Sequence, residues 1–119
     1  MKCDNLIAQK SKNFAIRIIR LYQYLCNDKK EFVLSKQLLK SGTSIGANIR
    51  EAMHGQSKAD FIAKLSISLK EASETEYWLE LLHETDYLDD NQFNSIIVGI
   101  KELLKLLTSI IKTSKKSNC

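Results

Sequence analysis

The sequence predicts an all-α protein, folded as an antiparallel up-down-up-down four-helix bundle. Proline is absent from the 119 residues and glycine occurs four times, so few positions oppose helix formation. Apolar residues recur at helical spacing in four segments, and short polar turns separate these segments. Helices joined by short turns pack antiparallel to their neighbours, and this length suits one core. We therefore expect a single domain over residues 1–119.

The first two helices are predicted over about residues 5–26 and 33–54. The first ends in a polar turn, and its apolar stripe consists of Ile7, Phe14, Ile18, Leu21 or Tyr22, and Leu25. The second holds Gly42 and Gly46, each of which costs about 1 kcal/mol of helix stability relative to alanine. We expect these glycines to allow close approach of a neighbouring helix. The alternative is a break into two shorter helices.

The third and fourth helices have clear start signals. Ser57 suits an N-cap with Asp60 three residues later, and this helix is expected to reach about residue 86. Asp89 and Gln92 form a capping box for the fourth helix. The fourth helix has a regular apolar stripe, made of Phe93, Ile97, Ile100, Leu104, Leu107 and Ile111. The polar tail, about residues 113–119, is expected to fray.

The third helix carries two apolar stripes on nearly opposite faces. The first contains Phe61, Leu65, Leu69, Ala72 and Leu79. A surface helix of a monomeric bundle needs one stripe, whereas subunit interfaces favour tryptophan and tyrosine. We therefore predict a homo-oligomer, and the alternative is a central helix that buries both faces. The predicted interface residues are Ile67, Glu74, Tyr77, Trp78 and Leu81.

Cysteine usage and hydropathy favour a cytoplasmic protein. The three cysteines are odd in number and far apart, which fits free thiols better than a zinc site or a disulfide framework. The longest apolar runs span a handful of residues, whereas a membrane helix needs about 20. The polar start of the chain does not resemble a secretory signal.

Positive charge is concentrated in the first half of the chain. Residues 1–64 hold 12 Lys and Arg against 5 Asp and Glu, whereas residues 65–119 hold 6 against 9. On the first helix the basic residues are placed opposite the core stripe, and on the second they lie away from it. Such rows can neutralise phosphates, and a tyrosine among them can stack a base; the alternative is an ordinary solvated face. The candidate nucleic-acid-binding residues are Lys10, Arg17, Arg20, Tyr24, Lys36, Lys40 and Arg50.

The sequence offers little support for catalysis, a metal or another cofactor. The acidic cluster at Glu71, Glu74, Glu76 and Glu80 contains one Glu-x-x-His, ending at His83, whereas di-metal bundles need two. We expect these carboxylates to form salt bridges with the basic half of the chain. Arg50 and His54 resemble the Arg-His motif of HEPN-class ribonucleases, but that motif has more intervening residues. We therefore expect no enzyme activity.

Three segments resemble a known family. Residues 35–52 (SKQLLKSGTSIGANIREA) resemble the second-helix signature of the bacterial "four helix bundle protein" family, encoded in intervening sequences of 23S rRNA genes. Residues 58–65 (KADFIAKL) and 71–79 (EASETEYWL) resemble its third-helix signature. The chain departs from the family at Ala52, where glycine is common, and at Lys40, where arginine is common.

The resemblance implies a four-helix subunit that assembles into a homopentameric barrel. A related branch, the accessory variability protein of diversity-generating retroelements, binds nucleic acid through a basic surface and docks onto a reverse transcriptase. Most of the family has no established function. The leading hypothesis is a non-catalytic oligomeric scaffold that binds RNA or DNA. The alternative is a protein-binding accessory with no nucleic-acid role. We expect Asn48 and Glu51, which lie in the signature, to have a specific structural role, with Asn48 bonding across a helix interface.

Overall fold

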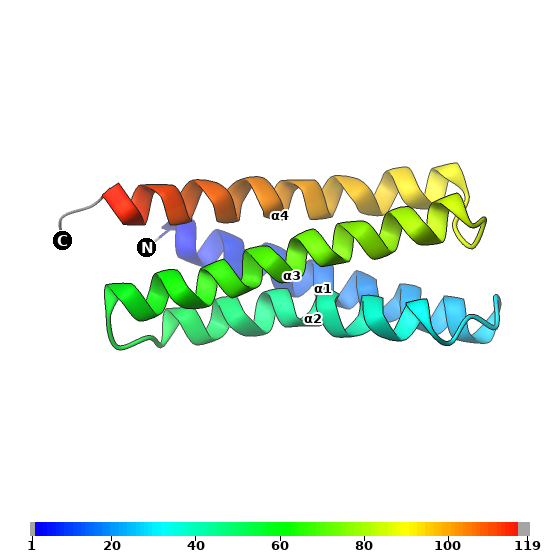
Figure 1. The fold of residues 1–119 in the computed structure, drawn as a ribbon, viewed down its shortest axis with the longest axis horizontal. Coiled ribbons are helices and arrows are strands. Elements are labelled where there is room, and N and C mark those ends of the chain that lie inside the picture. The colour runs from blue at the N-terminus through cyan, green and yellow to red at the C-terminus, as the bar shows by residue number, and fades with distance from the viewer. Residues whose placement is uncertain (1, 117–119) are drawn as a thin grey trace.

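The computed structural model describes residues 2–116, and its side chains from residue 6 onward. Four helices follow in chain order: α1 (Lys2–Asn27), α2 (Leu34–Met53), α3 (Lys58–Glu84) and α4 (Asp90–Lys116). They run in alternately opposite directions along a rod, as Figure 1 shows. The rod measures 49 × 21 × 19 Å. Each helix packs against its two neighbours in the ring α1–α2–α3–α4. The predicted four-helix bundle is therefore confirmed.

Most of the core comes from the apolar stripes that the sequence predicts, although Phe61 and Leu69 on α3 and Phe93 and Leu104 on α4 are only half-buried. On α1, Ile7, Phe14, Ile18 and Leu25 are buried, and on α4 the buried stripe includes Ile97, Ile100, Leu107 and Ile111. Helix α4 continues to Lys116, about one turn further than expected. The prediction of a frayed tail is therefore wrong for residues 113–116, and residues 117–119 lie outside the described range.

Helix α2 is continuous through its two glycines, so the alternative of two shorter helices is wrong. A Cβ atom at Gly42 would lie 2.8 Å from Cγ2 of Ile18 on α1, and one at Gly46 would lie 3.3 Å from Oγ of Ser11. Van der Waals contact requires a wider separation than the first distance. Gly42 is therefore required where α1 and α2 approach closely, as predicted.

A carboxylate that sequence analysis did not identify caps the start of α2. The buried Glu31 accepts hydrogen bonds from the backbone N–H groups of Val33, Leu34 and Ser35 at 3.2, 3.0 and 2.7 Å. Burial by itself raises the pKa of the Glu31 carboxyl, but these N–H donors outweigh burial and hold the pKa below its usual range. A negative charge is thus fixed at the positive end of α2.

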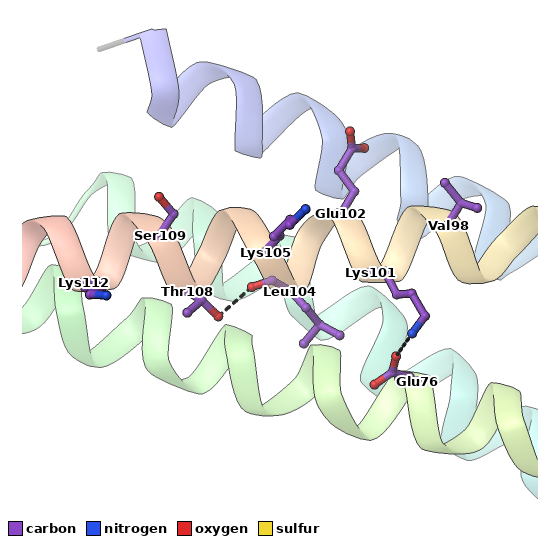
Figure 2. Close-up of a pocket in the computed structure, with 9 residues that line it drawn as sticks. All are labelled: Glu76, Val98, Lys101, Glu102, Leu104, Lys105, Thr108, Ser109 and Lys112. Atoms are coloured by element: carbon purple, nitrogen blue, oxygen red, sulfur yellow. Dashed lines mark hydrogen bonds and ion pairs between the residues drawn. The ribbon is translucent and has the colours of Figure 1, made fainter.

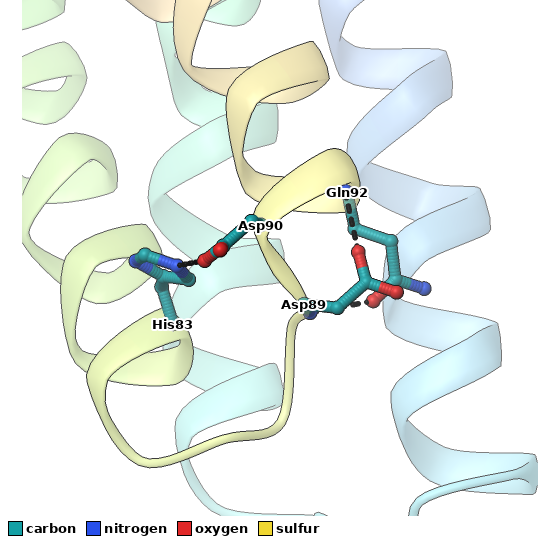
Figure 3. A network of polar contacts seen from close by, with 4 residues as sticks. All are labelled: His83, Asp89, Asp90 and Gln92. Atoms are coloured by element: carbon teal, nitrogen blue, oxygen red, sulfur yellow. Dashed lines mark hydrogen bonds and ion pairs between the residues drawn. The ribbon is translucent and has the colours of Figure 1, made fainter.

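The starts of α3 and α4 follow the predicted capping patterns. Ser57 Oγ accepts a hydrogen bond from the Asp60 N–H at 3.0 Å. At the start of α4, the Asp89 N–H donates to Gln92 Oε1 at 2.9 Å, and the Gln92 N–H donates to Asp89 Oδ1 at 2.8 Å (Figure 3). Both local predictions are therefore confirmed.

Polar contacts inside the bundle connect α2 to α3. Thr75 Oγ1 lies 2.9 Å from Ser41 Oγ, and Ser68 Oγ donates to the backbone oxygen of Ile45 at 2.8 Å. All of these side chains are buried. Buried hydroxyls require partners, so these bonds specify how α2 and α3 align along their length.

Candidate nucleic-acid interface

Two residues of the basic row on α1 do not point away from the bundle as predicted. Lys10 forms an ion pair with Glu102 on α4 at 3.2 Å. The Arg17 guanidinium donates to Ser95 Oγ at 2.8 Å and to the backbone oxygen of Ser95 at 3.3 Å. At about 100° per residue, Lys10 and Arg17 lie roughly a quarter turn from the core stripe, on the side where α4 packs. The prediction that these two residues occupy the opposite face is wrong for this geometric reason.

The two other candidates on α1 also lie beside its neighbours. Tyr24 is half-buried and packs against the core, which limits the stacking role predicted for it. Arg20 is exposed and lines a hollow of about 440 Å³ between α1 and α4, together with Arg17. Of the α1 candidates, Arg20 is therefore the exposed cation that forms no bond to a neighbouring helix among the described residues.

The basic row on α2 lies on the exposed side of its helix. Lys36, Lys40 and Arg50 are exposed and lie opposite the buried stripe that contains Leu38, Ile45 and Ile49. Among the described side chains, none of these three cations forms an ion pair. The α2 basic row, defined as Lys36, Lys40 and Arg50, is thus the exposed part of the predicted interface.

A groove runs along the outer seam between α1 and α2, beside the α2 basic row. Its volume is about 530 Å³. Lys12 and Arg50 lie on its two sides, and His54 lies at one end of α2. Its remaining lining includes small side chains, namely Ala8, Ser11, Ala15, Gly46 and Ala47. Sequence analysis missed Lys12, because its place in the groove depends on how α1 and α2 are rotated.

The outer face of α4 carries a second set of lysines. Lys101, Lys105 and Lys112 line an open hollow of about 950 Å³, shown in Figure 2. Lys101 pairs with Glu76 on α3 at 3.5 Å, whereas Lys105 and Lys112 have no ion pair among the described residues. The spacing of these lysines along one helix was visible in the sequence. This face provides a charge-matched comparison for the α2 basic row.

The predicted interface residues of α3 lie on the outside of the monomer. Ile67 and Tyr77 are 44% and 53% exposed, while Glu74, Trp78 and Leu81 are half-buried. The rings of Tyr77 and Trp78 are in contact, with centroids 5.4 Å apart. Trp78 Nε1 is buried and has no hydrogen-bond partner among the described residues. Within one subunit, the second apolar stripe is therefore incompletely covered.

The acidic cluster on α3 is not assembled as a metal site. No group of three or more potential metal ligands occurs among the described residues. His83 Nε2 lies 2.8 Å from Asp90 Oδ1 (Figure 3), and its ring stacks on Phe93. Glu76 pairs with Lys101, which lies in the acidic half of the chain, contrary to the salt bridges expected. Burial, followed by repulsion from Glu74, raises the pKa of Glu71, although Lys70 and Lys40 oppose the shift.

The two signature residues have separate roles. Asn48 donates its side-chain N–H to the backbone oxygen of Ser44 at 2.8 Å, within α2. The expected bond across a helix interface is therefore wrong. Glu51 forms an ion pair with Lys64 on α3 at 3.2 Å, so its carboxylate connects the two helices. None of the described helices is long and apolar enough to span a membrane.

Comparison with known proteins identifies close similarity. The model of the family described as 23S rRNA-intervening sequence protein matches residues 3–109. The chain is 61% identical in sequence to a protein of unknown function from the S23 ribosomal protein family of Bacteroides thetaiotaomicron VPI-5482, whose crystal structure has been determined. That match covers 92% of this chain and 98% of the other, with a TM-score of 0.91. The comparison with curated proteins gives no match.

Proposed function

Since the chain belongs to the 23S rRNA-intervening sequence protein family, we propose that it is a non-catalytic helical scaffold that binds RNA or DNA. The observation that carries this proposal is the α2 basic row, three exposed cations without ion pairs among the described side chains. Lysine and arginine bind phosphates and release counterions, which favours association with nucleic acid. The contacts would be made mainly with the backbone, so little sequence preference is expected.

The proposal includes self-association through the outer stripe of α3. The exposed Ile67 and Tyr77 support a second copy at this face, since aromatic side chains anchor subunit interfaces. The fivefold number comes from the resemblance of the sequence to pentamer-forming proteins. An oligomer would repeat the α2 basic row and strengthen weak phosphate contacts through avidity.

Filter binding of labelled RNA and DNA at low salt tests the proposed function. The triple variant K36Q/K40Q/R50Q is compared with K101Q/K105Q/K112Q, which removes the same charge from α4. We expect the α2 variant to lose binding, with a salt dependence shallower by about 0.7–0.9 in log–log slope for each lost phosphate contact. Equal losses in both variants would indicate diffuse attraction instead of a defined interface. Absence of binding by the wild type at about 50 mM salt would refute the proposal.

Light scattering tests self-association. We expect the wild type to scatter as an oligomer and Trp78→Glu to scatter as a helical monomer, because a charged group at an interface lacks a partner there. Glu84→Gln, at an exposed position near the end of α3, is the control and should retain the oligomer. A monomer mass for the wild type would refute this part of the proposal.

The alternative function is a protein-binding accessory. Phe32 and Val33, in the turn before α2, are 58% and 72% exposed, which favours contact with another protein. Docking onto a reverse transcriptase is the specific form that the resemblance implies. Retention of a partner protein by K36Q/K40Q/R50Q, together with failure of the wild type to bind nucleic acid, would favour this function.

A further inference from the structure

We propose that the groove between α1 and α2 seats the phosphate backbone of one nucleic-acid strand. This inference rests on the proposed function and identifies the part of the surface that would hold the strand. The groove has a volume of about 530 Å³ and adjoins the α2 basic row through Arg50. The groove is therefore a concave surface next to cations that are exposed to solvent.

The charges around the groove favour an anion. Lys12 on α1 and Arg50 on α2 are exposed, and neither has an ion pair within the part of the chain whose side chains are described. Glu51 also lines the groove, but its carboxylate lies 3.2 Å from Lys64 Nζ on α3. The one acidic side chain in the lining is thus already paired, whereas the two permanent cations are not.

The shape of the groove favours a single strand over a duplex. Helices that pack through small residues lie about 8–10 Å apart, which leaves a furrow too narrow for a double helix to enter. The small side chains of Ala8, Ala15 and Ala47 keep this furrow open.

A larger uncharged side chain in the groove tests this inference without changing the charge of the protein. Ala47 lines the groove and is exposed, so Ala47→Leu adds volume there while leucine still favours helix. Ala59→Leu, at an exposed position in the first turn of α3, is the matched control. Labelled oligothymidylate and oligouridylate strands, and a DNA duplex of equal length, are the probes. Circular dichroism establishes that both variants are helical.

We expect Ala47→Leu to weaken binding of the strands and Ala59→Leu to leave it unchanged. Exclusion from Lys12 and Arg50 should make the log–log salt slope shallower by about 1.4, since each contact with a single strand contributes about 0.7. Lys12→Gln provides a second variant that retains the helix, and its slope should change by about 0.7, whereas Lys105→Gln should leave the slope unchanged. A difference between the two strand types would identify the preferred nucleic acid.

The contrary outcomes separate this inference from the proposed function. If Ala47→Leu and Lys12→Gln bind strands like the wild type while K36Q/K40Q/R50Q does not, the groove is overturned and the proposed function stands. If the wild type binds the duplex more tightly than either strand, a single strand is not the occupant. If the wild type binds no probe, both the groove and the proposed function are overturned.

Discussion

Helices α1 and α2 each carry a row of lysines and arginines, but two residues of the α1 row bond to α4, whereas the α2 basic row forms no ion pair among the described side chains. On α1, Lys10 pairs with Glu102 and Arg17 bonds to Ser95, both on α4. On α2, Lys36 and Lys40 remain exposed without ion pairs among the described side chains. The difference shows that a charge on a helix is less available for binding where a side chain or backbone group of a neighbouring helix bonds to it. Lys10 and Arg17 therefore stabilise the bundle, and the α2 row is available for a partner.

The largest expected effect on stability concerns the tight packing of α1 against α2, which fixes the rotation of α2 relative to α1. Gly42→Val should lower the free energy of unfolding by about 3 kcal/mol, because added methyl groups would overlap Ile18 and overpack the seam. Ala47→Val, on the exposed face of the same helix, should change it by about 0.5 kcal/mol. Urea unfolding measures both. Equal stabilities of the two variants would mean that the α1–α2 seam does not constrain α2.

The next effect concerns the start of α2, just before the α2 basic row. Glu31→Ala should lower the free energy of unfolding by about 2 kcal/mol at neutral pH, because three backbone N–H groups lose their acceptor. Glu31→Gln should lie between this variant and the wild type, since the amide oxygen can still accept.

The Glu31 contribution should also depend on pH. Its carboxyl pKa is lowered in the folded protein, so the unfolded chain binds the proton more readily. The stability it contributes is present above the unfolded pKa of about 4.3 and is lost as pH falls through the lower folded value. Urea unfolding from neutral to acidic pH should show the wild type and Glu31→Gln converging. A constant difference across this range would contradict the proposed charge effect.

The smallest expected effects on stability come from single substitutions in the basic rows of α1 and α2, which compare the two rows directly. Arg17→Gln should lower the free energy of unfolding by about 1 kcal/mol through loss of its bonds to Ser95, with little change in nucleic-acid binding. Lys40→Gln should change stability by about 0.5 kcal/mol or less while making the salt slope shallower by about 0.7–0.9. The reverse pattern, with Arg17→Gln impairing binding and Lys40→Gln leaving it intact, would exchange the assigned roles of the rows.

The sequence by itself determined the number of helices, most of their bounds and their buried stripes. These features depend on local rules: Asp89 and Gln92 cap α4 within one turn, and the spacing of Ile97, Ile100 and Leu107 specifies which face is buried. Gly42 was also interpretable locally, since a glycine kept inside a helix indicates close approach. Such signals need no knowledge of the neighbouring helices.

Only the tertiary structure decided which flank of each helix the neighbours cover. A period of 3.6 residues locates the centre of the buried face but not the width that is covered on either side. That width depends on how helices rotate and cross, which placed Lys10 and Arg17 against α4 and brought Lys12 beside Arg50 in one groove. The sequence therefore showed which residues carry charge, whereas the availability of each charge for binding depended on side chains distant in the chain.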